Sequence, residues 1–124
     1  MYIDWNKINT NYENSVKEFL IWLSKKYSNK FLLEMNCIPN ENTICYCDLE
    51  KFFDDNGIII SILYRNVISN NIDKWYFKMY DDYGNDTSEG CKTRSEAKEQ
   101  AIYKAFKILE ERLNGKENIR SENI

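Results

Sequence analysis

The chain has 124 residues, of which 43% are hydrophobic, 15% aromatic and 30% charged, as is usual for a folded domain. The formal net charge is −3 and histidine is absent, which excludes Ser-His-Asp and Cys-His catalysis and most catalytic zinc arrangements. The four glycines are scattered singly, so the sequence holds no glycine-rich phosphate loop. We therefore expect a protein that is not an enzyme and needs no cofactor.

The cellular location is predicted from the apolar segments. No segment approaches the roughly 20 apolar residues of a membrane helix, and the start MYIDWNKINTNYE lacks the plan of a signal peptide. We expect a cytoplasmic protein of a bacterial host that does not contact the membrane.

The N-terminal third predicts one helix over residues 11–27, with Asn11 as its cap and apolar residues at helical spacing. After it, residues 31–35 are extended or helical, and residues 38–42 form a turn. Residues 43–47 alternate as a short strand does.

The middle of the chain predicts a short helix followed by a hairpin. Asp48 caps a helix of residues 48–56, and Gly57 closes it in a left-handed conformation. Residues 58–64 and 74–80 are β-branched or aromatic, which favours two antiparallel strands. Residues 66–73 are a polar loop, and residues 81–90 are a polar connection to the last helix.

The closing helix over residues 93–113 is the clearest signal in the chain. Thr93 is its cap and Glu96 completes a capping box. An apolar stripe runs beside a ladder of alanines that permits close packing on a sheet. The stripe is Ile102, Phe106, Leu109 and Leu113, and the ladder is Ala97, Ala101 and Ala105.

These elements predict an α+β fold in a single domain over residues 1–113. An antiparallel sheet of two to four strands is packed by an N-terminal and a C-terminal helix, in an α-β-β-β-α-like order with a short extra helix near 48–56. Residues 114–124 are predicted to be a flexible polar tail.

The string from Arg94 to Phe106 resembles the C-terminal signature of double-stranded-RNA-binding domains. Ala97-Lys98, Ala101 and Ala105-Phe106 match that signature in spacing, whereas Ser95 replaces its second basic residue. The resemblance implies that Lys92, Arg94 and Lys98 grip phosphates of an RNA duplex. The family's glycine-proline-histidine loop has no match here.

A looser resemblance covers more of the chain. The series LEKFFDDNGI, a strand, WYF, a polar loop and the closing helix is similar to short uncharacterised proteins of bacterial phages and mobile elements. That resemblance implies a small protein-binding module, an inhibitor of the anti-defence type that acts on a host nucleic-acid-processing complex. The divergent RNA-binding domain is one alternative, and an enzyme that works through carboxylates is another.

Exposed acids and tyrosines are the candidate protein-binding residues. They are Asp54, Asp55, Asp81, Asp82, Asp86, Tyr76 and Tyr80. The acids would meet a basic groove on a partner that handles nucleic acid. Tyr76 and Tyr80 share one strand face with Lys74 and Lys78, as in proteins that bind single strands or on an ordinary exposed sheet face.

No metal site is predicted. The loop of residues 81–89 is acidic but lacks the ligand spacing of a calcium loop. The four cysteines are expected to be free thiols that are buried or half-buried, because a reducing compartment is the default. They are Cys37, Cys45, Cys47 and Cys91.

Overall fold

The structure is a computed structural model that describes residues 3–27, 44–67, 72–81, 84–88 and 90–122, with side chains described except at residues 27, 66–67, 72–73 and 116–122. Within these residues the fold is α+β, with helices toward both ends and an antiparallel three-stranded sheet, so the predicted class is confirmed. The chain divides into two compact units: Met1–Ile3 with Glu41–Ala105, and Asp4–Asn40 with Phe106–Ile124. The last helix contributes its first part to one unit and the rest to the other.

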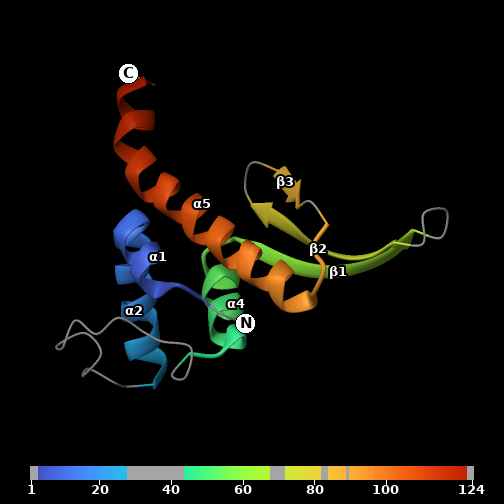
Figure 1. Cartoon of the computed structure of the whole chain (residues 1–124). Helices are drawn as coiled ribbons and strands as arrows, with labels where there is room; N and C mark the ends of the chain where they lie inside the picture. The colour runs from blue at the N-terminus through green and yellow to red at the C-terminus, as the bar shows by residue number, and fades with distance from the viewer. Residues whose placement is uncertain (1–2, 28–43, 68–71, 82–83, 89, 123–124) are drawn as a thin grey trace. The chain divides into compact units, whose positions relative to one another are not determined.

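The first unit contains the sheet (Figure 1). Its elements are α4 (Tyr46–Asp55), β1 (Ile59–Val67), β2 (Ile72–Asp81), β3 (Gly84–Thr87) and the start of α5 (Arg94–Glu122). Strand β2 is central and pairs antiparallel with both neighbours. The predicted hairpin is therefore confirmed, and both of its strands extend into the predicted polar loop.

Strand β3 lies inside the segment for which a plain polar connection was predicted, and that prediction was wrong. Its sequence Gly-Asn-Asp-Thr has no apolar alternation, and all four residues are exposed. Backbone pairing with Lys78–Asp81 of β2 therefore holds the strand without help from buried side chains. A search for hydrophobic periodicity does not detect a strand of this kind.

The core of the first unit lies against one face of the sheet. Strand residues Ile60, Phe77 and Met79 are buried there. The helices add apolar residues that are buried as predicted: Leu49, Phe52 and Phe53 from α4, and Ala97, Ala101, Ile102 and Ala105 from α5. Gly57 has a φ of 75°, so the predicted left-handed closure of α4 is confirmed.

Helix α4 begins two residues before the predicted start. Cys45 is its N-cap, Tyr46 and Cys47 are helical, and Asp48 lies in the first turn. The strand predicted over residues 43–47 is therefore wrong for Tyr46 and Cys47, and Asp48 is not the cap. A carboxylate in the first turn still stabilises the helix, because that end carries the positive pole of the helix dipole.

The start of α5 is capped nearly as predicted. Thr93 Oγ1 accepts a hydrogen bond from Glu96 N at 3.1 Å. The Glu96 carboxylate accepts a hydrogen bond from Lys92 N at 3.2 Å, whereas a capping box would have it accept from Thr93 N. One backbone donor in the first turn of the helix and one just ahead of it are thus satisfied by side chains. The helix continues past Leu113 to Glu122, and the flexibility of residues 114–124 stays a prediction.

The second unit is helical. Its elements are α1 (Trp5–Asn11), α2 (Glu13–Tyr27) and the part of α5 after Ala105. Helix α1 was not predicted, and Asn11 ends it instead of capping the next helix. Asp4 caps α1 by accepting a hydrogen bond from Lys7 N at 3.1 Å. The predicted apolar stripe of α2 is confirmed, since Val16, Phe19, Leu20 and Leu23 are all buried.

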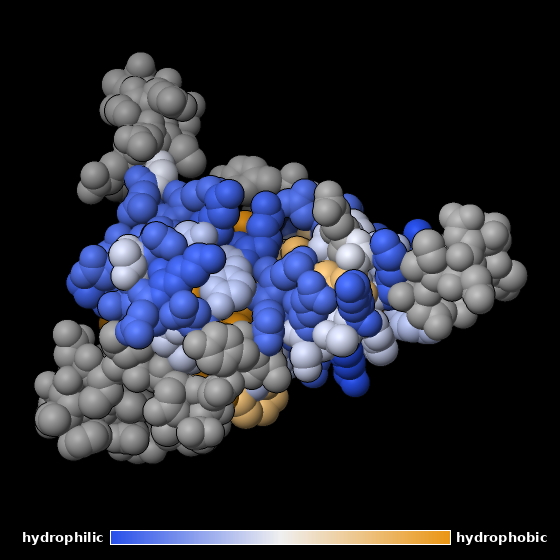
Figure 2. All heavy atoms as spheres, in the orientation of Figure 1, coloured by the Kyte–Doolittle hydropathy of each residue, from blue (hydrophilic) through white to orange (hydrophobic). Residues whose placement is uncertain are grey.

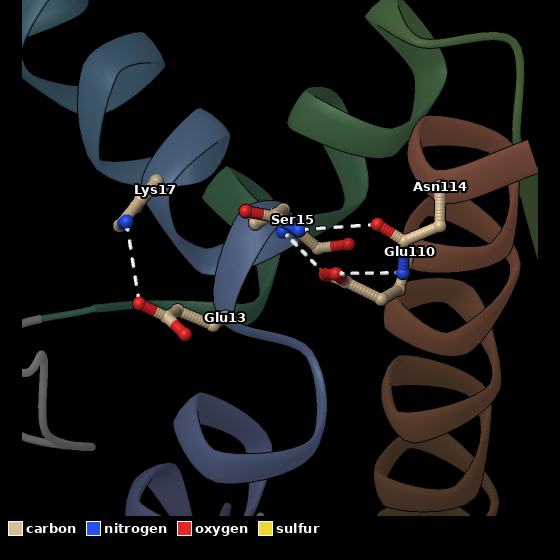
Figure 3. A network of polar contacts seen from close by, with 6 residues as sticks. Glu13, Ser15, Lys17, Glu110 and Asn114 are labelled. Atoms are coloured by element: carbon tan, nitrogen blue, oxygen red, sulfur yellow. Dashed lines mark hydrogen bonds and ion pairs between the residues drawn. The ribbon is translucent and has the colours of Figure 1, made fainter. Parts of the chain in front are cut away.

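A polar network within the second unit joins the start of α2 to α5 (Figure 3). Ser15 N donates to Glu110 Oε1 at 2.8 Å, and Ser15 Oγ donates to the Phe106 carbonyl at 3.2 Å. Asn114 Nδ2 donates to Glu110 Oε2 at 3.5 Å. The side-chain oxygen of Asn114 accepts a hydrogen bond from Asn14 Nδ2 at 3.2 Å. A buried glutamate of one helix therefore caps the N-terminus of another.

The segments predicted at residues 31–35 and 38–42 lie outside the described residues. Among the helices that the structure describes, none has the length and apolar character needed to cross a membrane. In the view of Figure 2, the described surface is mostly hydrophilic, with small hydrophobic areas.

Candidate functional site: the outer face of the sheet

The strand register defines two faces of the sheet in the first unit. Ile60, Phe77 and Met79 point into the core, so the residues that alternate with them form the opposite face, here called the outer face. The outer face consists of Ile59, Ser61, Leu63 and Arg65 on β1, Lys74, Tyr76, Lys78 and Tyr80 on β2, and Asn85 and Thr87 on β3.

Large apolar side chains are exposed on the outer face. Ile59 is 44% exposed, Leu63 is 43% exposed and Tyr80 is 40% exposed. Ile59 pairs with Tyr80 across the strands, and Leu63 pairs with Tyr76. Paired residues of this kind lie side by side on a sheet, so these four side chains form two apolar pairs on one face, with Ser61 and Lys78 between them.

Cations lie between and beside these two apolar pairs. The Arg65 guanidinium lies 5.7 Å from the centre of the Tyr76 ring, and the Lys78 ammonium lies 5.4 Å from the centre of the Tyr80 ring. Lys74 adds a third positive charge, and no Asp or Glu of the described strands belongs to this face. The outer face is therefore apolar and basic, although the whole chain has a net charge of −3.

The predicted acidic residues do not share this face with the tyrosines. Asp86 pairs with the inward-pointing Met79, and its carboxylate lies 3.7 Å from the Lys104 ammonium of α5. Asp54 and Asp55 are exposed at the end of α4, and Asp81 is half-buried at the end of β2. Asp82 lies outside the described residues. Of the predicted protein-binding set, Tyr76 and Tyr80 alone are placed on the outer face.

The three basic residues of the RNA-binding alternative lie at the start of α5. Lys92 and Arg94 are exposed, and Lys98 is half-buried. The Arg94 guanidinium lies 5.8 Å from the Trp75 ring centre, and the Lys98 ammonium lies 4.6 Å from that of Tyr46. Burial raises the pKa of the Tyr46 phenol above its ordinary value, and the charge of Glu50 acts in the same direction. Tyr46 therefore offers Lys98 a neutral aromatic face.

Two of the cysteines differ from the prediction. Cys45 and Cys47 are exposed and joined in a disulfide, so the prediction of free, buried thiols is wrong for this pair. Cys91 is free and buried, as predicted, and Cys37 lies outside the described residues. In this disulfide form, the two sulfurs and an oxygen of Asp48 lie within 4.8 Å of one another.

Ile59, Leu63 and Arg65 are the candidate binding residues that the sequence did not indicate. Strand β1 is apolar at nearly every position, so its sequence does not distinguish a buried face from an exposed one. Only the register with β2, where cations alternate with aromatics, assigns them to the outer face. No protein-family model, curated protein or solved structure was found to match the chain.

Proposed function

We propose that this chain is a small, non-enzymatic protein-binding module that contacts its partner through the outer face of the sheet. The observation that carries the proposal is the presence of two cross-strand pairs with exposed apolar side chains, Ile59–Tyr80 and Leu63–Tyr76, on one face of the sheet. Exposed apolar side chains gathered on a rigid element are typical of protein interfaces, and tyrosine is enriched among the residues that dominate binding energy.

The charges of this face indicate the chemistry of the partner surface. Lys78 lies between the two apolar pairs, and Arg65 and Lys74 lie beyond the Leu63–Tyr76 pair, with no acid of the described strands on this face. A partner surface with an apolar centre and acidic groups around it would be complementary. The exposed Asp54 and Asp55 form a separate contact for a basic surface, as an inhibitor of a host nucleic-acid-processing complex would use.

Substitutions on the outer face test this function. With a partner isolated from a bacterial host lysate, we expect Tyr80→Ala to weaken binding by about 2 kcal/mol, roughly thirtyfold. Leu63→Asp should abolish binding, because it places a charge beside Tyr76 in one of the two apolar pairs. Lys107→Asp, at an exposed position of α5, is the matched control and should bind normally. Isothermal titration calorimetry would measure all three variants.

A partner whose affinity is the same for Tyr80→Ala, Leu63→Asp and the parent chain would exclude the outer face as the contact surface. Circular dichroism of each variant would check that the sheet is intact.

Binding of double-stranded RNA is a second candidate, supported by the element order in the first unit. The succession α4-β1-β2-β3-α5 follows the α-β-β-β-α plan of the domains that the closing helix resembles. Contacts of Arg94 with Trp75 and of Lys98 with Tyr46 would hold two cations in place beside a helix N-terminus. Positioned cations at such a site favour phosphate binding.

An RNA duplex of about 20 base pairs, longer than the ~16 that such a domain spans, tests this candidate by fluorescence anisotropy. If the candidate is correct, binding will prefer RNA to DNA, weaken with salt and be lost in Arg94→Glu/Lys98→Glu. Lys107→Glu reverses one charge on the same helix, as each of the single variants Arg94→Glu and Lys98→Glu does, and should have a much smaller effect than either. Absence of binding at low salt, where phosphate contacts are strongest, would exclude this function.

A further inference from the structure

The first turn of α4 carries two reactive groups that neither proposed function uses. Cys45 is the N-cap of the helix and has no capping hydrogen bond from its side chain, and Cys47 lies in the first turn. Both cysteines are exposed, and their Cα atoms are 5.4 Å apart, within the usual range for a disulfide. A small reagent can therefore reach both sulfurs.

Cys91 has the opposite properties. It is 3% exposed, and its sulfur lies 3.4 Å from Gln100 Oε1. Burial raises the pKa of the Cys91 thiol, and the charge of Glu96 raises it further. Because the thiolate is the reactive form, Cys91 reacts slowly. Among the cysteines that the structure describes, thiol chemistry is concentrated at Cys45 and Cys47.

The surroundings of the pair distinguish its two sulfurs. The N-terminus of α4 favours negative charge on either sulfur. The reason is that the free amides of the first turn and the positive pole of the helix dipole lie at this end of the helix. Cys45 Sγ, however, lies 3.3 Å from Oδ2 of the buried Asp48. In the reduced form, this carboxylate accepts a hydrogen bond from the Cys45 thiol and repels a thiolate there. Cys47 is therefore the better nucleophile.

We propose that Cys45 and Cys47 form a reversible thiol–disulfide exchange site whose co-reactants are small thiols and disulfides of the glutathione class. The Cys47 thiolate attacks one sulfur of the small disulfide, which forms a mixed disulfide and releases one small thiolate. Cys45 then loses its proton and attacks the Cys47 sulfur, which forms the internal disulfide and releases the second small thiolate.

The exchange balances in atoms and electrons. Each protein sulfur is oxidised by one electron, both sulfurs of the small disulfide are reduced, and the two protons of the protein thiols end on the released thiols. Two small thiols reverse the reaction. The two reduced thiols and the disulfide of the structure are thus the two states of this site.

The test uses the full chain with Cys37→Ser, so that residue 37 cannot pair with the site. The protein is equilibrated with glutathione at a series of ratios of reduced to oxidised form, quenched with acid, unfolded and alkylated. We expect mass spectrometry of the intact protein to show a single transition, from a form with three alkylated thiols to a form with one, as the share of oxidised glutathione rises. Peptide fragmentation should assign the internal disulfide to Cys45 and Cys47 and the remaining label to Cys91.

Single variants test the order of attack. Cys45→Ser should accumulate a stable glutathione adduct on Cys47, because the second thiol is missing. Cys47→Ser should form its adduct on Cys45 more slowly, and Asp48→Asn added to Cys47→Ser should restore the faster rate by removing the repelling charge. Equal adduct rates in Cys45→Ser and Cys47→Ser would overturn the assignment of Cys47 as the attacking residue.

Two results of the equilibration would overturn the site itself. One is a chain that keeps three alkylated thiols even in excess oxidised glutathione. The other is an internal disulfide that excess reduced glutathione does not open. Both are measured on the chain with Cys45 and Cys47 intact, so neither depends on how well the single variants fold.

Discussion

Replacing Glu110 by alanine is expected to lower the free energy of unfolding by about 1–3 kcal/mol. Ser15 N is one of the first amides of α2, which have no carbonyl partner within the helix. It donates to Glu110 Oε1 at 2.8 Å, and Ser15 itself is fully buried (Figure 3). The Glu110→Ala variant would leave this donor without its acceptor, away from water. Urea unfolding followed by circular dichroism measures the loss.

Glu110→Gln is the matched control because its amide keeps an oxygen at the same position. We expect it to lose less than the alanine variant, about 1 kcal/mol, since the hydrogen bond persists without its charge. Equal losses in the two variants would show that the carboxylate charge at the start of α2, and not the hydrogen bond, provides the stabilisation. Unchanged stability in both would contradict the capping role of Glu110.

Replacing Phe19 by alanine should destabilise the second unit still more, by about 3–5 kcal/mol. Phe19 is fully buried among aromatic rings. Its ring centre lies 6.0 Å from that of Trp5, in a stacked arrangement, and 6.2 Å from that of Phe106, edge to face. Truncation removes these contacts and leaves a cavity.

Phe19→Leu fills most of that cavity and is expected to lose clearly less. Tryptophan fluorescence during urea unfolding would report on the change, because Trp5 and Trp22 both lie close to Phe19. A Trp75→Phe background removes the tryptophan of the first unit from the signal. A loss below about 1 kcal/mol in Phe19→Ala would show that the aromatic cluster is loosely packed.

The outer face shows why the candidate site was only partly predictable. On β2, cations and aromatics alternate with apolar residues, so the sequence alone assigned Lys74, Tyr76, Lys78 and Tyr80 to one face. Strand β1 carries no such alternation, and its contribution to the face depends on pairing with β2. The acidic residues were grouped with the tyrosines as candidate contacts with one protein partner, but strand alternation places Asp81 and Asp86 on the opposite face, and Asp54 and Asp55 lie on α4.

The sequence by itself determined the elements whose local pattern repeats several times. The stripe of α2, the buried residues of α4, the two long strands and the start of α5 all follow from apolar spacing and cap chemistry. These signals are local, since each depends on neighbours within one or two turns or on alternation along one strand.

Tertiary structure decided the remainder. β3 exists because its backbone pairs with β2, and the start of α2 is capped by Glu110, 95 residues further along the chain from Ser15. Cys45 and Cys47 were predicted to lie on a strand, but α4 begins there and brings their sulfurs together with the Asp48 carboxylate. Each of these features depends on backbone or side-chain partners that one segment's composition does not specify, so only the folded chain reveals them.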